Sequence, residues 1–180
     1  NGGYVPLDPV SLSPEMMRAE DWEYYTDHDY MNKFGQTLSP KEVNSSDYQA
    51  IYFAGGHGAI WDFRNNKELN DIALSIYNNQ GVLSSVCHGA AGLLDIKENG
   101  DYLVRHKDVT GFTNSEEQAN GTTEYMPYLL EDEFISNGAH FKKEDDWSNF
   151  AVVDGRIVTG QNPQSGHAVA EHALKILANQ

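Results

Sequence analysis

Two short apolar segments on either side of an amphipathic one constrain the fold more than any other feature of this sequence. Residues 48–54 are rich in aromatic and aliphatic side chains and stop at the glycine-rich stretch 55–58. After the Asn-Asn-Lys-Glu sequence at 65–68, apolar residues recur at helical spacing as far as Tyr77. A second apolar run, residues 81–86, follows directly. Strand, glycine loop, helix and buried strand make a βαβ unit, so we predict an α/β protein with a parallel sheet.

Four signals downstream of this unit predict further elements. Residues 150–159 form two apolar runs around an Asp-Gly pair, which strongly indicates a β-hairpin. Residues 127–136 begin with proline and predict a helix, and a final helix opens at Asn162-Pro163. Residues 108–113 are typical of another strand.

Size and charge restrict the class of protein. A chain of 180 residues is long enough for its own core, and we expect one domain over residues 1–180. The net charge of −15, from 27 acidic and 12 basic residues, argues against binding to nucleic acid or to an anionic membrane. A single cysteine excludes an intramolecular disulfide and a cysteine-based structural zinc site. We therefore expect a cytoplasmic protein with neither nucleic-acid nor membrane partners.

That cysteine, Cys87, lies between the second apolar run and the small-residue run 87–94. A nucleophile at a sharp strand-to-helix turn projects into a site, near backbone N–H groups that can hold an oxyanion. The positive end of the helix also favours thiolate over thiol. A cysteine near the end of a buried strand is also common as an inert core residue. The adjacent His88, and a glycine loop expected at the same edge of the sheet, favour the functional interpretation.

The residues around Cys87 suggest partners for its thiol. His88 is the candidate base, and an acid must orient its ring. Glu117 is the nearest candidate, but residues 114–117 also match a capping box with Glu117 as its third helical residue, and the sequence leaves both roles open. Gly55 and Gly56 allow close approach of the backbone, with N–H groups aimed at developing negative charge.

Other histidines are less informative. His57, in the glycine loop, is a candidate for the wall of the site. His167 and His172 are five residues apart, which places them on different helical faces and argues against a pair of metal ligands. We therefore predict no metal site.

Four motifs occur in a recognisable order: residues 54–58 with Trp61-Asp62, residues 86–90, residues 110–114 with Glu117, and residues 154–163. Together they make the chain resemble the ThiJ/PfpI superfamily, which has the class I glutamine-amidotransferase-like fold. The branch it is most similar to contains the glutathione-independent glyoxalases (D-lactate dehydratases) and related holding chaperones. The resemblance extends over nearly the whole chain.

This resemblance implies a flavodoxin-like sandwich, with helices on both faces of a mostly parallel sheet, in a homodimer. It implies Cys87 as nucleophile with His88 beside it, Glu117 as the acid of the triad, and the backbone N–H groups of Gly56 and His88 as the oxyanion hole. Gly55 and His57 would form the wall. The substrate implied is a small aldehyde, methylglyoxal, converted to lactate through a hemithioacetal on Cys87 in defence against carbonyl stress. No metal or organic cofactor is required.

Two other functions compete with this hypothesis. A non-catalytic stress protein, either a holding chaperone or a cysteine-based oxidant sensor, would need no turnover. A cysteine peptidase or glutamine amidotransferase shares related folds. The amidotransferases place a His-x-Glu pair late in the chain, and residues 167–171 (His-Ala-Val-Ala-Glu) do not fit that pattern.

The N-terminal part departs from the family pattern. The resemblance implies a first strand and helix, with a glutamate hydrogen-bonded to the nucleophile, that has no counterpart in residues 1–180. Since the chain starts at Asn1 rather than Met, we expect that this segment belongs to the native protein or forms a separate chain. Residues 1–46 show no convincing strand, and we predict short surface helices there whose Trp22 and Tyr25 faces pack inward.

Overall fold

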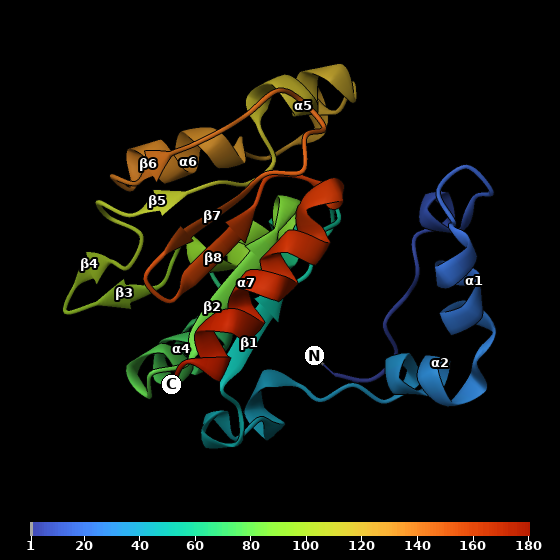
Figure 1. Ribbon diagram of the computed structural model, residues 1–180, viewed down its shortest axis with the longest axis horizontal. Coiled ribbons are helices and arrows are strands. Elements are labelled where there is room, and N and C mark those ends of the chain that lie inside the picture. The colour runs from blue at the N-terminus through green and yellow to red at the C-terminus, as the bar shows by residue number, and fades with distance from the viewer. Residues whose placement is uncertain (1) are drawn as a thin grey trace. The chain divides into compact units, whose positions relative to one another are not determined.

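The computed structural model describes residues 2–180 and divides into two compact units, with the boundary between Val43 and Asn44 (Figure 1). One family domain over residues 1–180 stays a prediction. Along the described residues, no helix combines the length and the apolar character that crossing a membrane requires.

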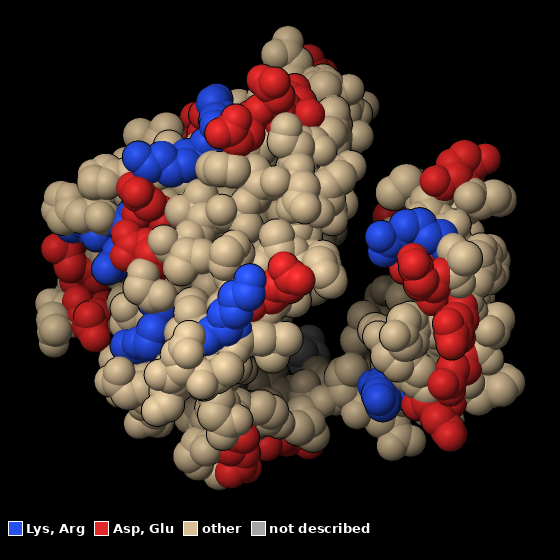
Figure 2. All heavy atoms as spheres, in the orientation of Figure 1, with Lys and Arg blue, Asp and Glu red and all other residues tan. Residues whose placement is uncertain are grey.

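The first unit contains short helices, as predicted. They are η1 (Pro9–Leu12), α1 (Ala19–Thr26), α2 (His28–Gly35) and η2 (Pro40–Glu42). The prediction that Trp22 and Tyr25 pack inward is wrong, because their rings meet each other edge-on at 5.7 Å and stay 42% and 37% exposed. None of the described residues of this unit is buried. Acidic side chains gather along its surface, as Figure 2 shows.

The second unit is built on a four-stranded sheet in the order β1-β2-β8-β7. Its strands are β1 (Ala50–Phe53), β2 (Val82–Val86), β7 (Ala151–Asp154) and β8 (Ile157–Gly160). β2 pairs in parallel with both β1 and β8, whereas β7 pairs antiparallel with β8. The βαβ unit and the Asp-Gly hairpin predicted from the sequence are both confirmed.

Helices α4 (Lys67–Asn78) and α7 (Gly166–Ala178) cover the two faces of this sheet (Figure 1). Successive strand residues point to opposite faces, so the packing partners of the two helices alternate along the strands. On one face Ala73 and Ile76 of α4 pack with Leu83 and Ile157; on the other, Val169 and Ala173 of α7 pack with Val82 and Val158. Fully burying a side chain such as Ile76 contributes about 1.5–3 kcal/mol, which fixes both helices on the sheet.

The remaining elements connect these layers. They are η3 (Ser45–Asp47), α3 (Ala59–Asp62), η4 (Cys87–Leu93), β3 (Lys97–Glu98), β4 (Asp101–Tyr102), β5 (Asp108–Val109), α5 (Asn114–Ala119), η5 (Thr123–Tyr125), α6 (Leu130–Ser136), β6 (His140–Phe141) and η6 (Pro163–Ser165).

Two of the predicted elements are shorter than expected. The strand predicted over residues 108–113 stops at Val109, because the Thr110 N–H donates to the Thr159 side chain instead of continuing a ladder; β5 pairs with β6 in a separate sheet. The helix predicted from Pro127 begins at Leu130, since Leu129 has an extended backbone.

The carboxyl ends of three parallel strands lie at one edge of the sheet. β1 leads into residues 54–58, β2 into residues 87–89 and β8 into residues 161–162. Ligands of open α/β sheets bind at this edge. The topology therefore brings the glycine loop and Cys87 together, as the sequence suggests.

Candidate active site

Cys87 occupies the sharp turn that the sequence predicts between β2 and a helix. Its φ of 56° is a left-handed conformation, which costs a non-glycine residue roughly 1–3 kcal/mol. Two glycines make room for the turn. A Cβ on Gly55 would lie 2.9 Å from the Cys87 Cβ, and a Cβ on Gly89 would overlap the carbonyl oxygen of Phe53. The helix that follows is a 3₁₀ segment, η4, pressed against β1.

Cys87, His88 and Glu117 form a chain of hydrogen-bonding distances. The Nδ1 atom of His88 is 3.4 Å from the Cys87 sulfur, and its Nε2 atom is 2.7 Å from Oε2 of Glu117. All three residues are buried. Because a carboxylate only accepts, Nε2 carries a proton, and in a neutral ring Nδ1 then presents its lone pair to the thiol. The structure thus brings together the three residues predicted as nucleophile, base and acid.

The capping box of α5 uses Glu116, not Glu117, as its third helical residue. Thr113 is the N-cap, and Glu116 accepts hydrogen bonds from the Thr113 N–H and hydroxyl. The capping interpretation of Glu117 is therefore wrong. Because consecutive helical residues diverge by about a quarter turn, Glu117 points away from the cap and reaches His88.

Glu117 accepts hydrogen bonds from three side chains. Besides His88, the Nε2 atom of His57 lies 3.2 Å from Oε1, and the Thr122 hydroxyl donates to the same oxygen. Burial acts to raise the pKa of Glu117, but the hydrogen bonds from His88 and Thr122 outweigh it, and the pKa lies below its ordinary value. The carboxylate is therefore ionised at neutral pH and holds the proton of His88 on Nε2.

The thiol of Cys87 is protonated at neutral pH. Burial raises its pKa to about 12, although the backbone N–H groups of His88 and Gly56 donate to the sulfur and act in the opposite direction; the charges of Glu116 and Glu117 add to the increase. The N–H groups at the helix start lower the pKa, in the direction that the sequence suggests, but burial outweighs them. Such a thiol needs a base as it attacks, and His88 is in place to supply one.

Aromatic rings line one side of the site. The ring centroid of His88 lies 4.2 Å from that of His57. It also lies 4.4 Å from the ring centroid of Phe112. Trp147 in turn meets Phe112 at 5.7 Å. The contacts of Phe112, Trp147 and Thr122 were not predicted. Phe112 had a signal in the Thr-Gly-Phe-Thr motif at 110–113, whereas Thr122 and Trp147 had none in the sequence.

Three of these side chains have the donor atoms of a metal site. One ligand atom from each of His57, His88 and Glu117 lies within 4.8 Å of the other two. His167 is instead beside Glu171 on the exposed surface of α7, and His172 is half-buried. No sequence pattern predicts that His57 and His88 both approach one carboxylate.

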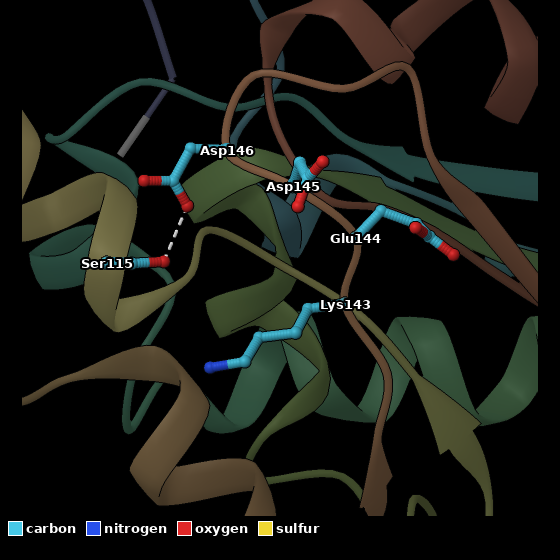
Figure 3. A pocket seen from close by; sticks show the side chains of 5 residues that line it. All are labelled: Ser115, Lys143, Glu144, Asp145 and Asp146. Atoms are coloured by element: carbon cyan, nitrogen blue, oxygen red, sulfur yellow. Dashed lines mark hydrogen bonds between the residues drawn. The ribbon is translucent and has the colours of Figure 1, made fainter.

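A pocket of about 550 Å³ opens beside the start of α5, lined by Ser115 and residues 143–146 (Figure 3). The Ser115 hydroxyl donates to Asp146 (2.6 Å), and Lys143 forms an ion pair with Glu131 (2.7 Å). The charged groups of the lining are therefore mainly carboxylates, and the residues of the Cys87 cluster do not line this pocket.

Comparison with known proteins decides the family. A model of the DJ-1/PfpI family matches residues 10–176. The chain belongs to the DJ-1/PfpI family. The ThiJ/PfpI resemblance drawn from the motifs is thereby confirmed.

Relatives within the DJ-1/PfpI family match almost the whole chain. The Saccharomyces cerevisiae protein named glutathione-independent glyoxalase HSP31 is 35% identical over 187 residues, which cover 98% of this chain and 78% of the relative. The structure of Francisella tularensis rapid encystment protein 24 kDa has a TM-score of 0.93 at 38% identity, covering 98% of this chain and 78% of that one. The structure of glyoxalase III from Candida albicans has a TM-score of 0.89 at 31% identity, covering 95% and 75%. The predicted flavodoxin-like fold class is confirmed.

Proposed function

We propose that this chain is a glutathione-independent glyoxalase that converts methylglyoxal to lactate on Cys87. Family relatives that cover nearly all of the chain carry the glyoxalase name. The observation that carries the proposal is the Cys87–His88–Glu117 relay, with the N–H groups of Gly56 and His88 at the sulfur.

The first step is addition of the thiol to the aldehyde. As the sulfur of Cys87 bonds to the aldehyde carbon, its proton passes to Nδ1 of His88, 3.4 Å away. The electron pair of the C=O bond moves to oxygen, where the N–H groups of Gly56 and His88 stabilise the charge. Return of the proton to this oxygen gives a hemithioacetal. Glu117 stabilises the imidazolium that exists between the two transfers.

The second step moves one hydrogen from carbon to carbon. His88 removes the proton of the former aldehyde carbon, which gives an enediolate. The hydroxyl proton on that carbon passes to the former ketone oxygen, and His88 returns its own proton to the neighbouring carbon. The product is a thioester of lactate on Cys87. Water then cleaves the C–S bond, and lactate leaves as the thiol is restored. The sum is methylglyoxal plus water to lactate, with no net oxidation and no glutathione.

The test is lactate formation from methylglyoxal by the purified protein, followed by proton NMR without glutathione. We expect turnover by the wild type and none by Cys87→Ala. His88→Asn should be similarly inactive, whereas His167→Asn, which changes a histidine whose side chain is 86% exposed, should be as active as the wild type. A wild type that makes no lactate, or a Cys87→Ala variant that makes it at the same rate, would overturn the proposal.

The proposal extends to assembly and location. We infer a homodimer that acts in the cytoplasm without nucleic-acid or membrane partners, and the net charge of −15 supports the absence of anionic partners. Light scattering coupled to size exclusion tests the dimer, because a monomer has a mass of 20.1 kDa.

A further inference from the structure

The two histidines and the carboxylate of the site converge as a metal-binding set would. Nε2 of His88 approaches Oε2 of Glu117, and Nε2 of His57 approaches Oε1, at 2.7 and 3.2 Å. Two imidazoles and one carboxylate are the ligands of many zinc sites that keep an open position. Two members of the relay, His88 and Glu117, thus form with His57 a set of three donors for a divalent transition metal.

Each donor comes from a different part of the fold. His57 follows β1, His88 follows β2 and Glu117 belongs to α5, so the site does not depend on one flexible loop. The His57 and His88 rings lie 4.2 Å apart with a tilt of 37°. The side chain of His57 is 37% exposed, which leaves a route from solvent, whereas His88 and Glu117 are buried.

The spacing suits an ion of the size of zinc. Nitrogen and oxygen atoms bound tetrahedrally at ~2.0–2.1 Å lie roughly 3.3 Å apart. The two hydrogen-bonded pairs are at 2.7 and 3.2 Å, and one ligand atom of each of the three residues lies within 4.8 Å of the other two. Binding an ion therefore requires a side-chain adjustment, which the half-buried His57 can make. The Thr122 hydroxyl donates to Oε1 of Glu117 and helps to orient the carboxylate, as groups around metal ligands commonly do.

A metal bound here would stop the reaction without touching the sulfur. Coordination by Nε2 of His88 displaces the proton from that atom, and the neutral ring then carries its proton on Nδ1. Nδ1 is the atom that faces Cys87 at 3.4 Å. Once protonated, it has no lone pair to accept the proton of the thiol.

We propose that His57, His88 and Glu117 form an inhibitory site for a divalent transition metal of the zinc type. The ion is no part of the reaction, so the expectation that no metal is required for turnover is unaffected. The proposed site nevertheless departs from the prediction of no metal site made from the sequence. The inhibition rests on the proposed glyoxalase function, whereas the binding site does not.

Binding and inhibition are measured separately. Titration of the full chain with ZnCl₂ in calorimetry is expected to give one site, and zinc affinity should fall about tenfold or more in His57→Ala. His167→Ala removes an exposed histidine beside a carboxylate and is expected to bind zinc as the wild type does. Cys87→Ala should also keep its zinc affinity, because sulfur is not a ligand. Calcium and magnesium, which prefer oxygen ligands, should neither bind here nor inhibit.

The outcomes distinguish this inference from the proposed function. Zinc that inhibits lactate formation in proportion to occupancy, with recovery after EDTA, supports the inference. Zinc affinity unchanged in His57→Ala, affinity lost in Cys87→Ala, or full turnover at saturating zinc overturns it. If the protein makes no lactate but binds zinc through His57, the proposed function fails while the metal site stands. A Co²⁺-loaded sample provides a second check, because a thiolate-to-cobalt charge-transfer band would contradict the nitrogen and oxygen donor set.

Discussion

Glu116 joins the start of α5 to two distant loops, and its replacement by glutamine tests how much that connection contributes to stability. The side chain is fully buried. Its Oε2 atom accepts from the N–H and the hydroxyl of Thr113, both at 3.1 Å. Its Oε1 atom accepts from Trp147 N (2.8 Å), Gln161 Nε2 (3.0 Å) and Asn162 Nδ2 (2.8 Å). Five donors therefore converge on one carboxylate.

The expected loss follows from counting these donors. In Glu116→Gln the amide oxygen keeps its place among the three donors of the loops, and the NH₂ group faces the Thr113 N–H, where two donors meet. A hydrogen bond to a charged group contributes about 1.5–3 kcal/mol, and the three bonds that remain become ordinary neutral ones. We therefore expect the free energy of unfolding to fall by about 2–4 kcal/mol. The Thr113 hydroxyl can rotate and accept, which limits the loss.

Urea denaturation followed by tryptophan fluorescence measures the change, and circular dichroism confirms that the variant is folded. The matched control is Glu124→Gln, the same substitution at an exposed position, which should change the free energy of unfolding by less than about 0.5 kcal/mol. A Glu116→Gln variant as stable as this control would refute the reasoning, since it would mean that the five donors do not require a charged acceptor.

Three further predictions concern the site itself. The pKa of Glu117 is lower in the folded than in the unfolded protein, so its ionised form stabilises the fold above the unfolded pKa. The difference in unfolding free energy between wild type and Glu117→Gln should therefore shrink as the pH falls below about 4.5, measured by urea denaturation at a series of acidic pH values. A difference that stays constant with pH would contradict this prediction. Since the Cys87 pKa is raised to about 12, its alkylation by iodoacetamide at pH 8 should be slower than that of free cysteine and should rise with pH beyond pH 10; a rate plateau near neutral pH would refute this. Gly55→Ala places a Cβ 2.9 Å from that of Cys87 and should lower kcat/KM by about tenfold or more. Gly58→Ala, in the same loop, meets no atom within 4 Å and should leave kcat/KM unchanged. Equal rates for the two variants would count against the close approach of Gly55 to Cys87.

The sequence predicts the parts of this fold that local patterns determine. The βαβ unit has its own periodicities, and the Asp-Gly pair at 154–155 specifies a hairpin without help from the rest of the chain. The turn at Cys87 is likewise predicted from two neighbouring runs, one apolar and one of small residues. These signals involve residues close in sequence, and they place nucleophile and glycine loop at one edge of the sheet.

The remaining features depend on contacts between distant segments. The capping box could begin at Thr113 or at Asn114, and this one-residue difference decides which of Glu116 and Glu117 caps the helix. The choice depends on the distant loop residues that donate hydrogen bonds to Glu116. The strand predicted at 108–113 ends early because Thr110 bonds to a side chain 49 residues away. Burial of the thiol, which outweighs the effect of the helix start on its pKa, is likewise a property of the folded chain.

The burial of Cys87 also bears on how this residue withstands peroxide. The thiolate is the form that peroxides oxidise to sulfenic acid and beyond, and a thiol with a pKa near 12 supplies almost none of it at neutral pH. An oxidant sensor needs the opposite arrangement, an exposed cysteine of low pKa. If Cys87 loses its proton only to His88 as an aldehyde arrives, we expect peroxide to oxidise it slowly at neutral pH. The burial that makes the nucleophile dependent on its base would then also protect it from oxidants.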